Sequence, residues 1–242
     1  GAHLRRWVIP GALALLPAAS YALALGLACI GTGVLGAGTL GLLRPSALWM
    51  LLAGLAAAGL ARTWRGARAR SFRIPSRPRL TWTAAAMGAL VIWYARLTLA
   101  DLAAPETFWD AMVYHLGVPA RWLESGRIAG RSPFFADMPL LSAAAWLPGL
   151  AWHGELPVRM GGVAWGGLLA AGVWMVARAW LDRRDALLAL LAGLSTPLVW
   201  IVLPHAGSDG ALAACAVLSV AALSRGAGSW PRGPARPGWL VL

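Results

Sequence analysis

The segment VRMGGVAWGGLLAAGVWMVARAW, residues 158 to 180, decides the fold of this chain. It is apolar except for one arginine near each end, Arg159 and Arg178. A helix needs about 20 mostly apolar residues to cross the hydrocarbon core of a bilayer. Arginines near the ends of such a helix are tolerated because their long side chains reach the headgroup region. The segment therefore predicts a transmembrane helix.

Further apolar segments with the length of a span occur on both sides of this one. The clearest are residues 81 to 99, 185 to 203 and 209 to 224. We expect two or three more spans before residue 62 and prefer three, because residues 7 to 43 are long enough to cross twice and residues 46 to 61 follow after Arg44. Two spans would agree better with an inner N-terminus, which the basic residues Arg5 and Arg6 favour. The predicted fold class is all-α, a polytopic transmembrane helix bundle that forms a single domain over residues 1 to 242.

The composition excludes a soluble domain. Of the 242 residues, 59% are hydrophobic and 12% are charged, whereas soluble domains carry about 25% charged residues. The net charge is +12, and the basic residues are all arginines, many of them beside apolar runs, which is typical of orientation in a membrane. We expect a multi-pass protein of the cytoplasmic (inner) membrane that contacts lipids and binds no nucleic acid. Because the chain begins at Gly1 and ends with WLVL, we also expect an amino-terminal fragment.

The arginines also predict the orientation. Residues 62 to 79 carry seven arginines and no acid, which is a strong cytoplasmic signal because positively charged loops stay on the inner side. The next span then ends outside, so residues 100 to 157 form an outer loop. By the same parity, residues 181 to 185 lie inside and residues 204 to 209 lie outside.

The outer loop of residues 100 to 157 contains two segments that favour the membrane surface. PLLSAAAWLPGLAW, residues 139 to 152, is apolar but too short for a comfortable crossing. FWDAMVYHLGVPARWLESGRI, residues 108 to 128, predicts a helix with Trp109 and Trp122 at the headgroup level. We therefore expect the loop to form a platform of interfacial helices.

Candidate chemistry lies mainly in the acids, because seven of the nine fall on the predicted outer side. On an α-helix, Asp110 and Tyr114 share one face, next to His115, which predicts an acid-base or metal-binding patch. The same aspartate equally fits a helix cap, a very common role for Asp. Asp209, which follows His205 at the outer mouth of a span, has the same two interpretations.

Two arginines flank the outer loop. Arg96 lies near the outer end of the span before it, and Arg159 lies near the start of the span after it. A lone arginine at such a position commonly extends to lipid headgroups. Its guanidinium also suits a phosphate, which it binds through two parallel hydrogen bonds. Both roles stay open for the two residues.

Taken in order, these motifs resemble a known superfamily. WDAMVYHLGVPARWLESGRI in the outer loop is followed by a span opening on LPVRMGGVAWGGLLAAGVWMVARAWLDRR, a second segment reaching STPLVW, and an outer aspartate in SDGALAACAVL. This order, over about residues 81 to 224, resembles the GT-C superfamily of polytopic glycosyltransferases, in particular bacterial relatives of protein O-mannosyltransferases and the aminoarabinose transferase of lipid A. The resemblance implies transfer of a sugar from a polyprenyl-phosphate carrier to an acceptor on the outer face, usually with inversion at the anomeric carbon.

The resemblance also implies roles for particular residues. Asp110 matches the first-loop aspartate, which in such enzymes acts as general base or helps to hold a divalent ion. Asp209 matches the second outer acid, and Arg159 matches the arginine near the start of the following span. Many members carry an Asp-Glu pair where this chain has Asp110 followed by Ala111. The resemblance thus implies a divalent metal ion as a possible cofactor. Because Ala111 replaces the usual glutamate, the sequence assigns no ligand set to it.

The predicted function is a glycosyltransferase that uses a lipid-linked sugar donor, with Asp110 and Asp209 as catalytic residues. The predicted substrate-binding residues are Arg96, Tyr114, His115, Arg159 and His205. The alternative is a non-enzymatic polytopic membrane protein, such as a transporter or an assembly subunit. A membrane hydrolase ranks last, because no Ser-His pair or metal cluster is evident in the sequence. The sugar, the carrier and the acceptor are left open.

Overall fold

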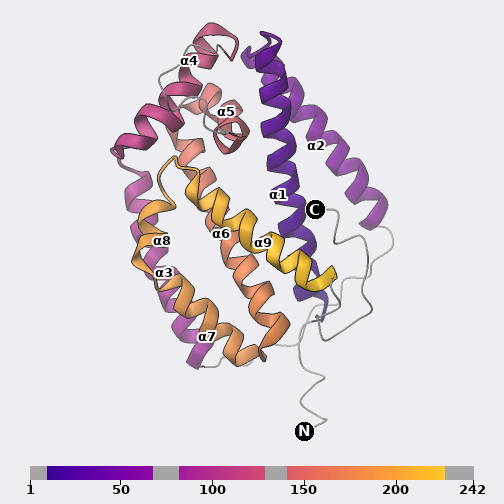
Figure 1. The fold of residues 1–242 in the computed structure, drawn as a ribbon, viewed down its shortest axis with the longest axis vertical. Coiled ribbons are helices and arrows are strands. Elements are labelled where there is room, and N and C mark those ends of the chain that lie inside the picture. The colour runs from indigo at the N-terminus through magenta and orange to yellow at the C-terminus, as the bar shows by residue number, and fades with distance from the viewer. Residues whose placement is uncertain (1–9, 68–81, 129–140, 227–242) are drawn as a thin grey trace.

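The computed structural model describes residues 10–67, 82–128 and 141–226 (Figure 1). Within these ranges the secondary structure is helical and contains no β-strand. The elements are α1 (Pro10–Thr39), α2 (Pro45–Ala67), α3 (Trp82–Leu102), the π-helix η2 (Ala111–Leu116), α4 (Gly117–Ser125), α5 (Leu141–His153), α6 (Glu155–Trp180), α7 (Arg183–Leu194), α8 (Pro197–Val202) and α9 (Asp209–Gly226). The predicted all-α class is confirmed for the described part of the chain.

Three of these helices are long and apolar enough to cross a membrane, which indicates a membrane protein. They are Leu16–Thr39 within α1, Ala85–Leu102 within α3, and the whole of α6. The helices α3 and α6 agree with the spans predicted at residues 81 to 99 and 158 to 180. Half of the α6 span is buried inside the bundle, compared with 6% of the α3 span. The segment at residues 158 to 180 is therefore part of the central helix, α6.

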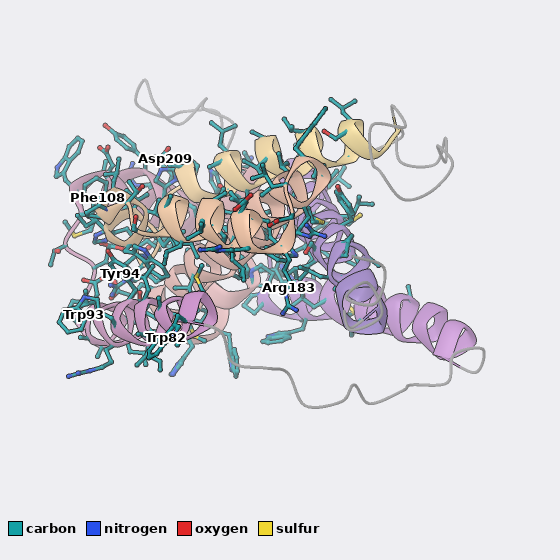
Figure 2. All side chains as sticks on the ribbon, turned by 90° about the horizontal axis from the view of Figure 1, so that it is seen from below. Trp82, Trp93, Tyr94, Phe108, Arg183 and Asp209 are labelled. Carbon is teal, nitrogen blue, oxygen red and sulfur yellow. The ribbon has the colours of Figure 1, made fainter. Side chains whose placement is uncertain are left out.

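The helix α3 turns most of its apolar surface outward (Figure 2). Trp82 is 92% exposed and Trp93 is 59% exposed. Contiguous apolar surface of this kind is rare on soluble monomers and marks contact with membrane or protein. The outer face of α3 therefore suits lipid or another apolar helix.

The prediction of three spans before residue 62 is wrong, because the structure has two helices there, α1 and α2. The glycines after Ile30 do not end α1. One of them, Gly31, lies against the start of α5, where a Cβ would come within 2.6 Å of the Leu141 carbonyl oxygen. Small residues at such positions allow two helices to approach closely. The chain turns only at Gly41, which has a φ of 73°.

The segment predicted as one span at residues 185 to 203 consists of two helices. Helix α7 ends at Leu194 and helix α8 begins at Pro197. Proline lacks the N–H that a helix interior needs, and it disfavours helical geometry in the residue before it. Thr196 is accordingly extended, with φ −68° and ψ 114°. The segment predicted at residues 209 to 224 is confirmed as a helix, α9, whose apolar part is shorter than the three candidate spans.

The segment predicted to lie in the membrane interface at residues 139 to 152 begins outside the described residues and otherwise lies in α5, which packs within the bundle. Its depth in a membrane stays a prediction. Ala144 and Leu147 are fully buried, and α5 packs against α1 and α6. Near it, the ends of α3, α6 and η2 and the start of α9 come together at one end of the molecule (Figure 1). This meeting point contains the predicted site residues except Arg96.

Candidate functional site

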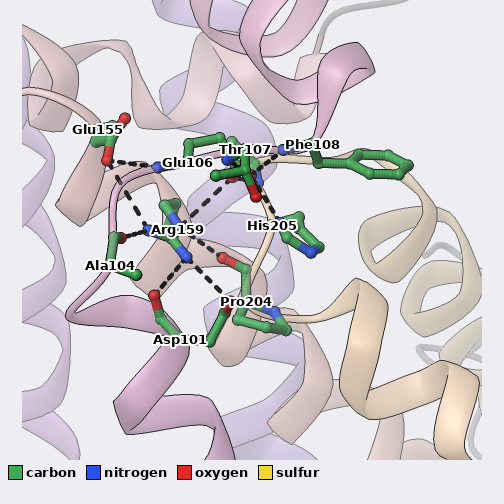
Figure 3. A network of polar contacts seen from close by, with 10 residues as sticks. Asp101, Ala104, Glu106, Thr107, Phe108, Glu155, Arg159, Pro204 and His205 are labelled. Atoms are coloured by element: carbon green, nitrogen blue, oxygen red, sulfur yellow. Dashed lines mark hydrogen bonds and ion pairs between the residues drawn. The ribbon is translucent and has the colours of Figure 1, made fainter.

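A network of buried polar groups joins three segments at this end of the bundle (Figure 3). Its centre is Arg159, in the first turns of α6, whose side chain is 1% exposed. The guanidinium donates hydrogen bonds to the carbonyl oxygens of Asp101 at 2.8 Å and Pro204 at 2.9 Å, and to that of Ala104. It also donates to the Asp101 carboxylate at 3.0 Å and lies 3.8 Å from the Glu155 carboxylate. One arginine thus fixes the end of α3 and the α8–α9 connection to α6.

Glu106 is the second centre of the network, and its side chain is fully buried. The carboxylate oxygen Oε1 accepts the backbone N–H groups of Thr107 at 3.0 Å and Phe108 at 2.9 Å. The same oxygen lies 2.7 Å from Nδ1 of His205. The other oxygen, Oε2, accepts the N–H of Ala206 at 3.1 Å. The carboxylate therefore joins the segment that leads into η2 to the segment that leads into α9 (Figure 3).

The surroundings of Glu106 favour its charged form. Burial by itself would raise the pKa of this carboxyl group, but the N–H groups of Phe108 and Ala206 and the contact with His205 together hold the pKa below its ordinary value. The guanidinium of Arg159 lies 3.5 Å from the carboxylate and adds a positive charge. A buried carboxylate needs this combination of hydrogen bonds and an opposite charge.

The element η2 is a π-helix, and this changes which side chains lie together. One turn of a π-helix brings together residues five apart instead of four. Trp109 and Tyr114 accordingly make an edge-to-face contact with ring centroids 5.5 Å apart. Asp110 and His115 have the same spacing, because the backbone at residues 111 to 116 is π-helical and not α-helical. The pairing of Asp110 with Tyr114 stays a prediction. Asp110 makes no capping hydrogen bond through its side chain, which removes the capping interpretation.

Gly117 makes the π-helix sterically feasible. Its N–H donates to the carbonyl oxygen of Met112, five residues earlier in the chain. A Cβ on this residue would lie 2.7 Å from that same oxygen, which is closer than carbon and oxygen atoms normally approach. Any side chain larger than hydrogen at this position therefore works against the π-helical turn.

His115 is influenced electrostatically by both predicted acids. Burial lowers the pKa of its ring from the ordinary value of 6.5, while the nearby negative charges of Asp209 and Asp110 act in the opposite direction. Its Nδ1 atom is buried without a hydrogen-bond partner. The ring borders a cavity of about 10 Å³, together with Trp146 and Gly207. This volume is close to the space that one water molecule needs.

The remaining predicted residues have different surroundings. Asp110 and Asp209 are both exposed, and Asp209 is the first residue of α9. The side chain of His205 is 16% exposed, and its ring stacks on Phe108 with centroids 5.1 Å apart. Arg96 is exposed on α3 and takes no part in the network. The charges of both aspartates thus reach His115, whereas Arg96 is exposed elsewhere on α3.

The partners of Arg159 were not predicted from the sequence. A signal was present, because an arginine buried at the start of an apolar helix needs carboxylates, and the outer loop carries Asp101 and Glu106 without an assigned role. Their pairing depends on how the loop folds back on α6. Since its donors are occupied by protein oxygens, direct contact of Arg159 with a lipid phosphate requires a rearrangement of the network. That contact stays a prediction.

No family model, curated protein or solved structure matches the chain. In the described residues, the fold has three helices apolar enough to cross a membrane and a buried polar network, near which the charges of Asp110 and Asp209 act on His115. The resemblance to the GT-C superfamily accordingly rests on the order of the sequence motifs.

Proposed function

We propose that the chain acts as a glycosyltransferase that moves a sugar from a polyprenyl-phosphate carrier to an acceptor at the outer face of the cytoplasmic membrane. The observation that supports the proposal is the electrostatic influence of both Asp110 and Asp209 on His115. The two carboxylates lie at the starts of η2 and α9, which are far apart in the sequence. Carboxylates and an imidazole in one place are suited to proton transfer.

Asp110 is the proposed general base. Its exposed carboxylate makes no capping bond, so it is open to accept the proton of an acceptor hydroxyl as that oxygen attacks the anomeric carbon of the sugar. In the same step the bond from this carbon to the carrier phosphate breaks, and the phosphate leaves with the electron pair. General base catalysis contributes about 10²- to 10⁴-fold in rate. Asp209 and His115 are proposed to orient the acceptor and to share the proton.

The leaving phosphate needs positive charge nearby, because negative charge grows on it in the transition state. Arg159 supplies such a charge from inside the protein. Arg96 is exposed on α3, and its planar guanidinium suits direct binding of a phosphate. Tyr114 and His205 are the further proposed substrate contacts. Both are partly accessible next to the exposed aspartates.

A divalent ion, which the resemblance would allow, does not fit the side chains of the described residues. In these ranges no three His, Cys, Asp or Glu residues are close enough to form a ligand set. Hard divalent cations are held by several oxygen ligands. No step of the proposed reaction is therefore assigned to a metal ion.

Sugar transfer in membranes that contain the full chain tests the proposal. Labelled polyprenyl-phosphate sugars are incubated with these membranes, and the label that reaches acceptors is separated from the lipid. Asp110→Asn and Asp209→Asn are expected to reduce transfer by at least about a hundredfold. Glu124→Gln, which changes an exposed acid of α4, is the matched control and is expected to leave transfer unchanged.

Two results would count against the proposal. Full transfer by the Asp110→Asn protein, in membranes where the parent chain is active, would remove Asp110 from the mechanism. Absence of transfer by the parent chain from any polyprenyl-phosphate sugar would reject the glycosyltransferase function. Size-exclusion chromatography of each variant in detergent checks that loss of transfer is not caused by unfolding.

A non-enzymatic membrane subunit is the second candidate function. One observation favours it, since only 6% of the α3 span is buried, and this apolar face suits a partner helix as well as lipid. The assay described above separates the two functions, because a subunit or a transporter leaves the labelled donor unconverted. Measuring the mass of the particle in mild detergent would detect a stable partner.

A further inference from the structure

The buried carboxylate of Glu106 takes no part in the proposed proton transfer, yet it lies between the two segments that carry the acids. Its Oε1 atom holds the N–H of Phe108, two residues before Asp110. Its Oε2 atom holds the N–H of Ala206, three residues before Asp209. We propose that Glu106 is a positioning residue that fixes the Asp110 segment and the Asp209 segment at the distance that sugar transfer requires.

The strength of the hydrogen bonds to Glu106, as well as the location of this carboxylate, supports the positioning role. Hydrogen bonds from N–H groups to an ionised carboxylate are about twice as strong as those between neutral groups. The Glu106 side chain is fully buried, so water does not replace these bonds when they break. Arg159 at 3.5 Å and His205 at 2.7 Å flank the carboxylate. The segment before Asp110 and the segment before Asp209 are therefore both hydrogen-bonded to the Glu106 carboxylate, which couples their positions.

The anchoring by Glu106 rests on contacts alone, whereas its effect on sugar transfer rests on the proposed function. Thiol cross-linking measures the anchoring without any substrate. Cys29 and Cys215, the two cysteines of the chain, are first replaced by alanine. Thr107→Cys and Gly207→Cys then add one thiol to each segment. Thr107 is exposed, and a Cβ on Gly207 meets no atom within 4 Å, so both positions have room for a thiol.

The cross-linking rate is measured with a short bifunctional thiol reagent on the full chain in membranes, and the product is identified by mass spectrometry. Glu106→Ala is expected to slow the reaction at least about tenfold, because several charge-assisted hydrogen bonds are lost. Glu106→Gln keeps the size and one accepting oxygen, and an intermediate rate is expected. Glu124→Ala removes an exposed acid of α4 and is expected to behave like the parent.

Equal rates in the parent and the Glu106→Ala protein overturn the proposal. If the alanine variant does not elute as a folded protein, the Glu106→Gln protein decides, and a rate equal to that of the parent overturns the proposal in the same way. Slower cross-linking in either folded variant, with Glu124→Ala unchanged, supports the anchoring.

Rescue by the cross-link connects the anchoring to the reaction. If Glu106 acts by holding the two segments together, a covalent link between positions 107 and 207 is expected to raise the transfer rate of the Glu106→Ala protein at least about tenfold. This is the change expected when the link replaces the hydrogen bonds that the substitution removes. A residue that took part in the chemistry would not be rescued in this way. Slow cross-linking together with undiminished transfer overturns the link to the reaction. If the parent chain transfers no sugar, the glycosyltransferase function is rejected. Slower cross-linking in the Glu106→Ala protein then still supports the positioning role of Glu106.

Discussion

Trp109 and Tyr114, five residues apart, face each other edge to face with ring centroids 5.5 Å apart. This spacing is one turn of a π-helix, and the same turn carries Asp110 to His115. An α-helix would instead bring Asp110 to Tyr114. The local backbone therefore decides whether this carboxylate meets an imidazole or a phenol, and π-helical turns of this kind are frequent at functional sites.

Gly117→Ala is expected to disturb this turn, because the added Cβ comes within 2.7 Å of the Met112 carbonyl oxygen and because alanine favours the α-helix over glycine by about 1 kcal/mol. Return to α-helical spacing separates His115 from Asp110. Since the charge of Asp110 raises the pKa of His115, this pKa is expected to fall further. An NMR titration of labelled histidine measures the change.

The matched control for this substitution is Gly88→Ala in α3, where a Cβ meets no atom within 4 Å. This variant is expected to leave the titration of His115 as it is in the parent chain. An identical His115 titration in the Gly117→Ala protein would show that the π-helical turn does not determine the surroundings of the ring.

Arg159→Gln is expected to destabilise the fold strongly. The substitution leaves the buried Glu106 carboxylate and the Asp101 carboxylate without their cation, and breaking a buried ion pair from one side typically costs about 3–5 kcal/mol. The free energy of unfolding is measured by chemical denaturation in detergent. Arg121→Gln, which changes an exposed arginine of α4, is expected to lose no more than about 1 kcal/mol, because substitutions of exposed surface residues usually have small effects. Equal losses in the two proteins would contradict the structural importance of the network.

Two glycines of α6 are expected to respond oppositely to the same substitution. A Cβ on Gly162 would lie 2.2 Å from the carbonyl oxygen of Leu203, so Gly162→Ala is expected to destabilise by about 1–3 kcal/mol through overpacking. A Cβ on Gly167 meets no atom within 4 Å, so Gly167→Ala is expected to be neutral or to stabilise by up to about 1 kcal/mol. Thermal unfolding in detergent compares the two, and equal midpoints would refute the predicted contact.

Two groups of the site predict how stability depends on pH. The pKa of Glu106 lies below its ordinary value of 4.5, so the stability it contributes is present above pH 4.5 and is lost as the pH falls through the lower, folded-state pKa. The pKa of His115 lies below 6.5, so the unfolded chain binds a proton before the folded chain does, and stability decreases as the pH falls below 6.5. His115→Asn is expected to remove the loss in the higher range, and Glu106→Gln the loss in the lower range. A flat profile in the parent chain would contradict both assignments.

The spans α3 and α6 could be predicted from the sequence, because length and hydropathy report directly on the ability to cross a membrane. The helix boundaries within the other apolar segments could not be predicted from length and hydropathy. Gly31 lies inside α1 and serves packing against α5, a contact with a distant part of the chain that hydropathy does not report. Pro197 was a readable signal for the break between α7 and α8, since proline interrupts helices in apolar and polar sequence alike.

The surroundings of the predicted site could be inferred only in part. Asp110, His115 and Asp209 were identified from their types and their positions in the outer segments, and the charges of both aspartates act on the His115 ring. The π-helical backbone of η2 was not predicted, because the choice between α-helix and π-helix depends on a backbone contact at Gly117 rather than on hydropathy. The partners of Arg159 depend on long-range folding of the loop, which a single sequence does not encode in any short pattern.

The break between α7 and α8 has a mechanical consequence. An interrupted helix in an apolar environment must satisfy its carbonyl groups within the protein, because no water is available there. The Leu194 carbonyl accepts the indole N–H of Trp200, and the Ser195 carbonyl accepts the hydroxyl of Tyr94 at 3.5 Å. The rings of Tyr94 and Trp200 are stacked with centroids 4.3 Å apart. These contacts attach the bend to α3. A rotation of α7 relative to α8 therefore has to separate the stacked rings of Tyr94 and Trp200 first.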